Sequence, residues 1–292
     1  MKNTTYALIT GASSGIGKAI AYELARRKIN LILIALPNSG LKEVREDIVI
    51  RFDIKTDLLE LDLTIPESHQ VVFQWCQSRS YDIGILVNNA GIGNLCAFEN
   101  TDASFITRML MLNNQAMVAL VHLFAAQLKR RGAAYILNVG SLGSFFPLPY
   151  KSVYAATKGF VHAFSSALRL EWKQYNVHVS CLCPGSTMTS KEVVERAKTL
   201  PTNYLNLHQT AESVASEAVT ALFQKKKTIV PGWSNKVLYH LAFVLPSFVI
   251  DWFLLRIFSR NQLRDSLPKA LQYKLTKTDT NNISLTEDIP LI

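Results

Sequence analysis

Short apolar runs rich in β-branched residues alternate along the chain with segments whose apolar positions recur every three or four residues. Runs of this length are typical of buried strands, and the periodic segments are typical of amphipathic helices. The predicted strands are TYALIT (5–10), NLILIAL (30–36), DLLELDL (57–63), IGILVNN (83–89), AAYILNVGS (133–141), NVHVSCLCP (176–184) and KTIVPG (227–232). The predicted helices cover about 15–28, 41–52, 66–79, 100–131 (as two segments), 152–175 and 211–224.

This alternation predicts the fold class. Continuously apolar strands separated by helices indicate a parallel sheet that is covered on both faces. Right-handed crossovers then produce a doubly wound α/β fold, in which ligands bind at the carboxyl ends of the strands. We therefore predict a parallel sheet of about seven strands within one domain over 1–232.

The pattern changes beyond the last predicted strand. Residues 237–258 are mostly apolar, and His240, Ser247 and Asp251 form only a narrow polar stripe on a helix. Pro246 breaks or kinks that helix, and together with Asp251 it argues against a membrane-spanning segment. We predict an apolar helical extension over 233–260 and a polar, partly flexible tail over 261–292.

Composition narrows the class of protein. The 292 residues, 49% of them apolar, can bury a substantial core, and we find no internal repeat. The four cysteines are too few and too scattered for a disulfide framework, and Cys181 and Cys183 are predicted to be small buried thiols. The six histidines lack metal-ligand spacing, so no metal site is predicted. The N-terminus leaves little room for a secretory signal, which predicts a reduced, cytoplasmic setting.

The net charge of +9 is concentrated in one part of the chain. Residues 225–277 contain ten Lys or Arg and two Asp, a net charge of +8. The excess is therefore local, and it lies within and on both sides of the apolar extension.

A glycine-rich turn, TGASSGIG (10–17), follows the first predicted strand and opens the first predicted helix. Gly11, Gly15 and Gly17 let the backbone turn sharply and approach a pyrophosphate, and the helix N-terminus supplies N–H donors. The alternative is a tight turn in which Ser13 or Ser14 caps the helix.

Polar residues end three further strands. Asp62 follows the third strand, where its carboxylate could accept a bond from an adenine amine or cap the next helix. NNAG (88–91) ends the fourth strand, where its side chains can fasten adjacent loops, and Ser141 ends the fifth.

Tyr154 and Lys158 lie four residues apart in SVYAATKGF (152–160), so a helix places a phenol and an ammonium on one face. Taken alone, the pair is more typical of a surface lysine beside a half-buried tyrosine than of two side chains that act together.

Five motifs in this order resemble the short-chain dehydrogenase/reductase family: TGASSGIG, NNAG, Ser141 thirteen residues before Tyr154, YAATK, and PGSTMT (184–189). The match covers about 5–231. The resemblance implies a Rossmann-type sheet, a nicotinamide cofactor, and hydride transfer between that cofactor and a carbonyl or alcohol carbon.

The resemblance also implies roles for individual residues. Tyr154 would donate or accept the proton, and the Lys158 ammonium would lower the pKa of the phenol and bond the nicotinamide ribose. Ser141 would hold the substrate oxygen. Asn113, with Asn114 beside it as the alternative, would relay protons through water. The positions implied for cofactor binding are Gly11, Ser13, Ser14, Gly15, Ile16, Gly17, Asp62, Leu63, Asn89, Ala90, Gly91, Tyr154, Lys158, Pro184, Gly185, Thr187 and Thr189.

For two of these positions, Thr187 and Thr189, the alternative is that they cap the following helix.

The sequence departs from the family pattern after the second strand, in ALPNSG (35–40). It has no acid there to bond a ribose 2′-hydroxyl and no arginine to bind a 2′-phosphate, although Asn38, Ser39 or a backbone nest could do so. We favour NADP(H) because the repulsive carboxylate is missing; NAD(H) is the alternative.

The expected substrate is a hydrophobic or lipid-like ketone or alcohol, because apolar residues surround the predicted site. Residues 191–207 follow the last motif, and in the family this region closes over the substrate. Its apolar members are Val193, Val194, Leu200, Tyr204 and Leu205, and Phe145, Phe146 and Leu148 follow Ser141. The alternative is that all of these are core. Rival functions are a cofactor-binding regulator or scaffold without turnover, and a nucleotide-sugar epimerase.

The sequence also predicts which parts of the chain contact other molecules. The helices over 113–131 and 152–175 match those that often pair subunits in this family, so a homo-oligomer is expected. Residues 233–277 suit either peripheral docking on the anionic inner face of a membrane or a lid or subunit contact. No nucleic-acid-binding motif accompanies the charge, so we predict no nucleic acid.

Overall fold

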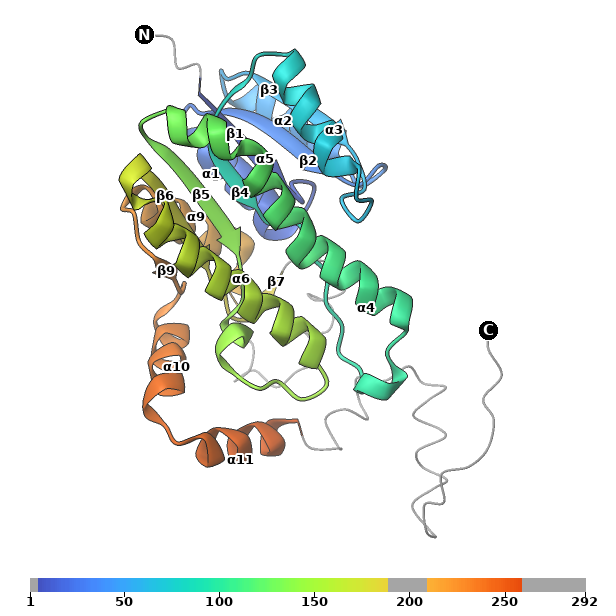
Figure 1. The fold of residues 1–292 in the computed structure, drawn as a ribbon, viewed down its shortest axis with the longest axis vertical. Helices are drawn as coiled ribbons and strands as arrows, with labels where there is room; N and C mark the ends of the chain where they lie inside the picture. The colour runs from blue at the N-terminus through green and yellow to red at the C-terminus, as the bar shows by residue number, and fades with distance from the viewer. Residues whose placement is uncertain (1–4, 189–208, 259–292) are drawn as a thin grey trace, which may run out of the picture. The chain divides into compact units, whose positions relative to one another are not determined.

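The computed structural model describes residues 5–188 and 209–258, and it confirms the predicted α/β fold. Within these residues, seven strands form one sheet in the order β3-β2-β1-β4-β5-β6-β9 (Figure 1). Every pairing in this sheet is parallel. The strands are β1 (Thr5–Thr10), β2 (Asn30–Ala35), β3 (Thr56–Glu60), β4 (Asp82–Asn88), β5 (Ala134–Val139), β6 (Val177–Leu182) and β9 (Thr228–Ile229).

Successive residues along each strand face opposite layers of helices, as a parallel sheet requires. In β1, Ala7 and Ile9 face the core formed with α1 (Gly15–Arg26), α2 (Leu41–Arg51) and α9 (Ala211–Phe223). Leu8 faces the core formed with α3 (Ser68–Ser78), α5 (Ala116–Arg130) and α6 (Ser152–Glu171). The strands are therefore buried on both sides, which explains why they are apolar throughout.

The two helical segments predicted over 100–131 form one continuous helix. Its first part, α4 (Ala103–Leu110), passes through a π-helical turn over Met111–Gln115 into α5. Among the described residues, this helix alone has the length and hydropathy of a membrane span. However, Leu120, Phe124 and Leu128 are buried in the core, so it is a core helix of the α/β fold.

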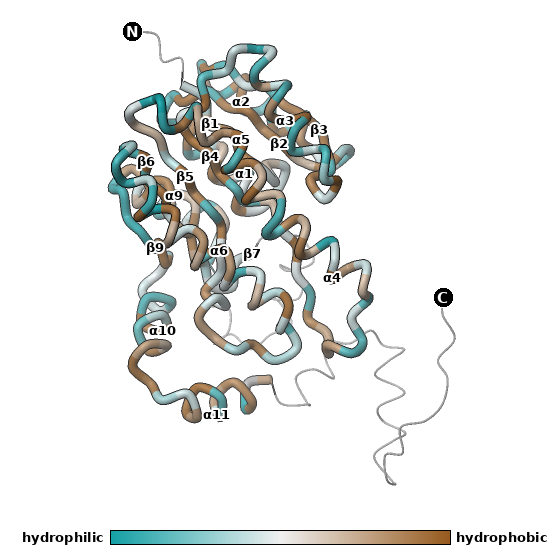
Figure 2. Tube along the Cα trace, viewed as in Figure 1, coloured by the Kyte–Doolittle hydropathy of each residue, from teal (hydrophilic) through white to brown (hydrophobic). Residues whose placement is uncertain are grey.

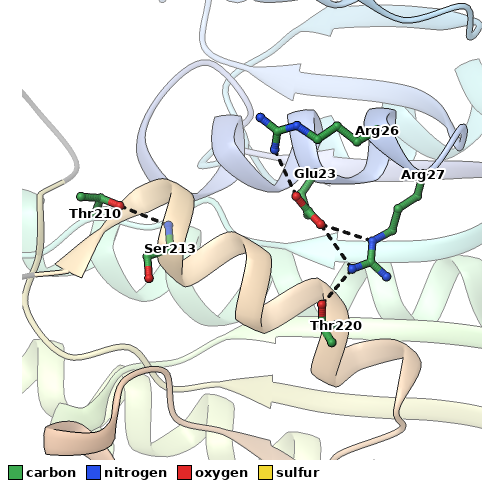
Figure 3. A network of polar contacts seen from close by, with 6 residues as sticks. All are labelled: Glu23, Arg26, Arg27, Thr210, Ser213 and Thr220. Atoms are coloured by element: carbon green, nitrogen blue, oxygen red, sulfur yellow. Dashed lines mark hydrogen bonds and ion pairs between the residues drawn. The ribbon is translucent and has the colours of Figure 1, made fainter.

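Polar contacts join α1 to α9, two helices that pack in the same core (Figure 3). Arg27 Nη2 donates to Thr220 Oγ1 at 2.8 Å and to Glu23 Oε1 at 3.3 Å. Thr210 caps α9, because its Oγ1 accepts from the Ser213 N–H at 3.2 Å. These contacts anchor the helix that leads into β9.

A second, two-stranded parallel sheet was not predicted from the sequence. It pairs β7 (Thr187–Met188) with β8 (Gln209–Thr210). The pairing places Thr187 beside Gln209 and Met188 beside Thr210.

The chain divides into two compact units, 1–244 and 245–292. Helix α10 (Trp233–Val244) belongs to the first unit, although the sequence assigned it to the extension beyond 232. Helix α11 (Ser247–Ile257) belongs to the second, and Pro246 lies at its N-cap. The break predicted at Pro246 is confirmed.

Candidate active site

The glycine turn has a backbone that only glycine permits. Gly11 and Gly15 have φ angles of 66° and 53°, in the left-handed region. A Cβ on Gly17 would lie 2.2 Å from the carbonyl oxygen of Gly11. Ser14 occupies the N-cap position of α1, but its side chain makes no capping hydrogen bond. The turn therefore presents the helix N-terminus in the way the phosphate-binding interpretation requires.

Asn89 fastens the end of β4 to this turn, as predicted for NNAG. Its Nδ2 donates to the carbonyl oxygens of Thr10 at 3.0 Å and Gly11 at 3.1 Å. In return, Thr10 Oγ1 accepts from the N–H groups of Asn89 and Ala90, both at 3.0 Å. The carboxyl ends of β1 and β4 thus form one rigid edge.

The structure brings Ser141, Tyr154 and Lys158 together beside that edge. Ser141 follows β5, and its Oγ accepts from the Gly143 N–H at 3.0 Å. Lys158 is 5% exposed, and its Nζ donates to the Val139 carbonyl oxygen at 2.9 Å, which ties α6 to the end of β5. The same Nζ lies 5.9 Å from the centre of the Tyr154 ring.

The electrostatics of Tyr154 differ from the sequence-based expectation. Burial raises the pKa of its phenol, and a hydrogen bond with Ser141 opposes that rise only in part. Lys158 was expected to lower this pKa, but its ammonium is directed at a backbone carbonyl. Burial also lowers the pKa of Lys158 to about 8, because a desolvated ammonium is disfavoured. At neutral pH the protein alone therefore holds a protonated phenol beside an ammonium.

Asn113 lies in the π-helical turn, a feature that often marks functional sites. Its Oδ1 accepts from the Ile92 N–H at 2.9 Å, and its Nδ2 donates to Thr157 Oγ1 at 3.1 Å. A Cβ on Gly91 would lie 3.0 Å from Asn113 Oδ1 and 3.3 Å from Lys158 Nζ. Asn114 instead donates to the backbone of Thr157 at 2.9 Å. Asn113 is therefore the asparagine that faces the cluster.

Two residues near Tyr154 were missed from the sequence. A Cβ on Gly93 would lie 2.5 Å from Cδ2 of the Tyr154 ring, so the ring packs directly on this glycine. Lys151 Nζ lies 5.7 Å from the centre of the same ring. The helical spacing of Lys151 and Tyr154 could have indicated the second contact.

The other predicted cofactor positions occupy varied surroundings. Asp62 lies beyond the end of β3, and its Oδ1 accepts from both the N–H and the Oγ1 of Thr64 at 2.8 Å, which closes a local turn. It does not cap the next helix, because α3 begins at Ser68 with Glu67 at its N-cap. Ile16 and Leu63 are buried in the two cores. Thr189 and the segment 191–207 lie outside the described residues.

The residues after β6 contact the loop that follows Ser141. The Pro184 carbonyl oxygen accepts from the Leu142 N–H at 2.8 Å. Thr187 Oγ1 donates to the Gly185 carbonyl oxygen at 3.1 Å. The predicted buried thiols, Cys181 and Cys183, are confirmed: both are free, with their Sγ atoms 3.6 Å apart.

The turn after β2 has a backbone suited to an anion. Asn38 and Gly40 have φ angles of 57° and 81°, and Ser39 Oγ donates to the Leu36 carbonyl oxygen at 2.6 Å. Alternation of left- and right-handed residues directs successive N–H groups to one side. A cleft beside this turn is lined by Ser13, Lys18, Tyr22, Gly40, Glu43, Val44, Asp47 and Arg51.

Comparison with known proteins identifies relatives along most of the chain. The family model for short chain dehydrogenase matches residues 5–199. A very-long-chain 3-oxoacyl-CoA reductase of Vanderwaltozyma polyspora is 28% identical over an alignment of 255 positions, which covers 83% of this chain and 72% of that protein.

Two solved structures match nearly the whole chain. One is a bulky-bulky ketone specific alcohol dehydrogenase from Comamonas testosteroni, with a TM-score of 0.70, 26% identity, and coverage of 97% of this chain and 98% of that one. The other is a short-chain dehydrogenase from Sphingobium yanoikuyae in complex with NADPH, with a TM-score of 0.70, 26% identity, and coverage of 96% and 99%.

Proposed function

This chain belongs to the short-chain dehydrogenase family, and we propose that it uses NADPH to reduce a hydrophobic, lipid-like ketone. As a member of that family it is an NAD(P)-dependent oxidoreductase that acts on C=O or CH–OH groups. The observation that carries the proposal is the convergence of Ser141, Tyr154 and Lys158 beside the glycine turn. Such a cluster has no role in a binding-only regulator.

The residues present fit a nicotinamide dinucleotide. At Gly11 and Gly17 a Cβ would collide with Asn89 Nδ2, so glycine lets the turn fold closely over the N-terminus of α1. The side chain of Ser14 does not cap this end, and its N–H groups suit a pyrophosphate. Gly91 lies close to Asn113 and Lys158. When bound, NADPH supplies the hydride that the carbonyl carbon receives.

The proton comes from the protein. Tyr154 carries its proton at neutral pH, because burial raises the pKa of the phenol, and it donates this proton to the carbonyl oxygen of the substrate. Ser141 Oγ donates a hydrogen bond to the same oxygen and orients it. In the protein alone the Lys158 ammonium does not offset the effect of burial on Tyr154. We propose that it offers a positive charge to the phenolate formed during the reaction, and that Asn113 holds the path through which water returns a proton.

A hydrophobic substrate is proposed because aromatic side chains surround the loop after Ser141. The ring of Phe145 lies 4.8 Å from that of Tyr239 and 5.8 Å from that of Phe243, both on α10. Phe145, Phe146 and Tyr239 are packed against a buried core cluster but remain partly exposed. We propose that their exposed parts form an apolar wall, which suits an acyl or other bulky chain better than a sugar, whose hydroxyls need polar partners. The similarity to an oxoacyl-CoA reductase and to a bulky-ketone dehydrogenase agrees with this choice.

NADPH is proposed over NADH because the turn itself, residues 36–40, contains no acid to bond a ribose 2′-hydroxyl. The cleft beside the turn carries both signs of charge, Lys18 and Arg51 with Glu43 and Asp47. Asn38 and the left-handed backbone at Gly40 offer hydrogen-bond donors. The similar Sphingobium dehydrogenase was solved in complex with NADPH, which supports the choice.

Peripheral contact with an anionic membrane is proposed as well. On α10, Trp233, Val237, Leu241 and Val244 are exposed at helical spacing, on the side away from Asn235 and Tyr239. Considered by itself, α11 also carries an exposed apolar stripe, formed by Phe248, Trp252 and Leu255. Figure 2 shows the apolar residues along both helices.

The positive charge of this part of the chain favours a lipid surface as the partner that contacts these stripes. Residues 225–277 carry a net charge of +8, and each cation near an anionic surface adds about 1 kcal/mol. Exposed tryptophan suits the interface between headgroups and acyl chains. The protein would then take its substrate from the cytoplasmic side of the bilayer. Subunit contact is the competing occupant, and helices α5 and α6 remain the predicted homo-oligomer surface.

The first prediction concerns Tyr154→Phe. Removing the phenolic hydroxyl should lower kcat for ketone reduction about 100- to 10,000-fold, because the proton donor is lost. The dissociation constant for NADPH, measured by fluorescence titration, should stay within about threefold of wild type. Activity within about tenfold of wild type would remove Tyr154 from this role.

The second prediction concerns pH. The pKa of Lys158 is held at about 8, so its ammonium is present below that pH and is lost above it. Tyr154 stays protonated over the same range because its pKa is raised. Since kcat/KM for NADPH reports groups of the free enzyme, it should be flat near pH 6–7 and fall about tenfold per unit above pH 8–9. A profile that stays flat to about pH 10 contradicts the requirement for the ammonium.

The third prediction concerns the nucleotide. Wild-type protein titrated with each reduced nucleotide should bind NADPH at least as tightly as NADH, because the turn after β2 has no acid to bond the ribose 2′-hydroxyl of NADH. A preference of about tenfold for NADH, equal to about 1.4 kcal/mol, overturns the assignment.

The fourth prediction concerns membranes. The protein should sediment with phosphatidylglycerol vesicles at low salt, and less with phosphatidylcholine vesicles or at high salt. Phe248→Ser with Trp252→Ser should reduce this binding. The control, Ile50→Ser with Val71→Ser, replaces exposed apolar residues of α2 and α3 and should not. Wild-type protein that remains in the supernatant at low salt rules out docking, and a double variant that changes only the oligomeric state assigns the α11 stripe to a subunit contact.

A further inference from the structure

We infer that Asn235, in the first turn of α10, is a positioning residue that holds the Pro184–Gly185 turn in its working place. The inference rests on the proposed function, because that turn is among the predicted cofactor positions. No sequence motif identifies Asn235, and the inference rests on its contacts in the structure.

Asn235 is the buried residue of an otherwise largely exposed helix, and only 4% of its surface is exposed. Its Nδ2 donates to the Pro231 carbonyl oxygen at 3.0 Å, which closes the turn between β9 and α10. An amide buried in this way must be satisfied by partners, and here they are the nearby Pro231 and residues from distant parts of the chain.

Gln209, at the start of β8, supplies the second contact. In one orientation its Oε1 accepts from Asn235 Nδ2 at 3.0 Å. In the other, its nitrogen donates to Pro231 O at 3.1 Å and its oxygen accepts from the Gly232 N–H at 3.2 Å. Either orientation joins β8 to the turn before α10, and β8 is itself paired with β7.

Gly185 supplies the third contact, and it is the closest. A Cβ on Gly185 would lie 2.4 Å from Asn235 Oδ1 and 2.7 Å from both Cγ and Nδ2. The amide therefore lies directly against the Gly185 backbone, in space that any other residue would fill. Gly232, with φ of 77°, accommodates Gln209 similarly, since a Cβ there would lie 2.6 Å from Nε2.

Two contacts connect these residues to the loop that Ser141 begins, and so to the proposed chemistry. The Pro184 carbonyl oxygen accepts from the N–H of Leu142, the residue after Ser141, at 2.8 Å. From the same helix as Asn235, Tyr239 packs against Phe145 in the loop that Ser141 begins. Asn235 thus fixes the cofactor-side turn relative to the helix that forms the substrate-side wall. Small displacements in such an arrangement cost rate more than they cost stability.

The experiment compares Asn235→Ala with Asn30→Ala. Asn30 is 8% exposed and lies at the opposite, amino end of β2, where its Oδ1 accepts from the Lys55 N–H at 3.0 Å. Both variants lose a buried amide and should lower the melting temperature. Only Asn235→Ala should raise KM and Kd for NADPH and lower kcat, each by about tenfold, because only it releases the turn. Asn235→Ser, which keeps a polar group, should recover part of this loss.

A second measurement tests the contact itself. Gly185→Ala should disturb wild-type protein, since the new methyl group displaces the Asn235 amide. In the Asn235→Ala background the methyl has room, so the same change should cost less in melting temperature and in NADPH affinity than it does alone.

The outcomes separate this inference from the proposed function. NADPH binding and ketone reduction by wild-type protein decide the function alone. For Asn235, an unchanged KM and Kd, within about twofold, alongside a lowered melting temperature assigns a purely structural role and overturns the inference. Strictly additive effects of the Gly185 and Asn235 substitutions overturn it too.

Discussion

The direction of the first crossovers constrains everything else in this protein. From β1 the chain winds outward through β2 and β3 on one side, and through β4, β5, β6 and β9 on the other. The connections after β1 and β4 leave in opposite directions, so neither covers the edge between them. Gly11, Gly17 and Asn89 pack this edge so closely that no larger side chain fits at the glycines. The other elements of the candidate site are arranged around this edge.

Burial determines the electrostatic character of the site. Lys158 is an ammonium almost wholly removed from water, and its Nζ donates to the carbonyl oxygen of Val139. Desolvation of this kind is tolerated because the opposing polar group is a fixed backbone dipole at the end of a strand. Burial acts on Tyr154 in the opposite sense and keeps its phenol protonated. Together these shifts leave a protonated phenol beside an ammonium at neutral pH, which is the starting state that the proposed reduction requires.

Helix α10 connects the site to the surface of the protein. Its inner side carries Asn235 and Tyr239, which contact the Gly185 turn and Phe145, and its outer side carries the exposed stripe that begins at Trp233. A helix with two such sides contacts the candidate site on one side and presents an apolar stripe on the other. This arrangement accounts for an apolar extension directly after the last strand of a nucleotide-binding sheet.

The sequence by itself determined the strands, the fold class and the order of the motifs, because these depend on local periodicity and on residue types at short spacing. It also placed Tyr154 and Lys158 on one helical face and indicated the break at Pro246. Only the tertiary structure decided that Asn113 lies in a π-helical turn, that β7 pairs with β8, that Gly93 supports the Tyr154 ring, and that Asn235 contacts Gly185. It also reversed the expected direction of the Tyr154 pKa. These features arise from contacts between residues far apart in the chain and from the exclusion of water, and neither leaves a periodic or local signal in the sequence.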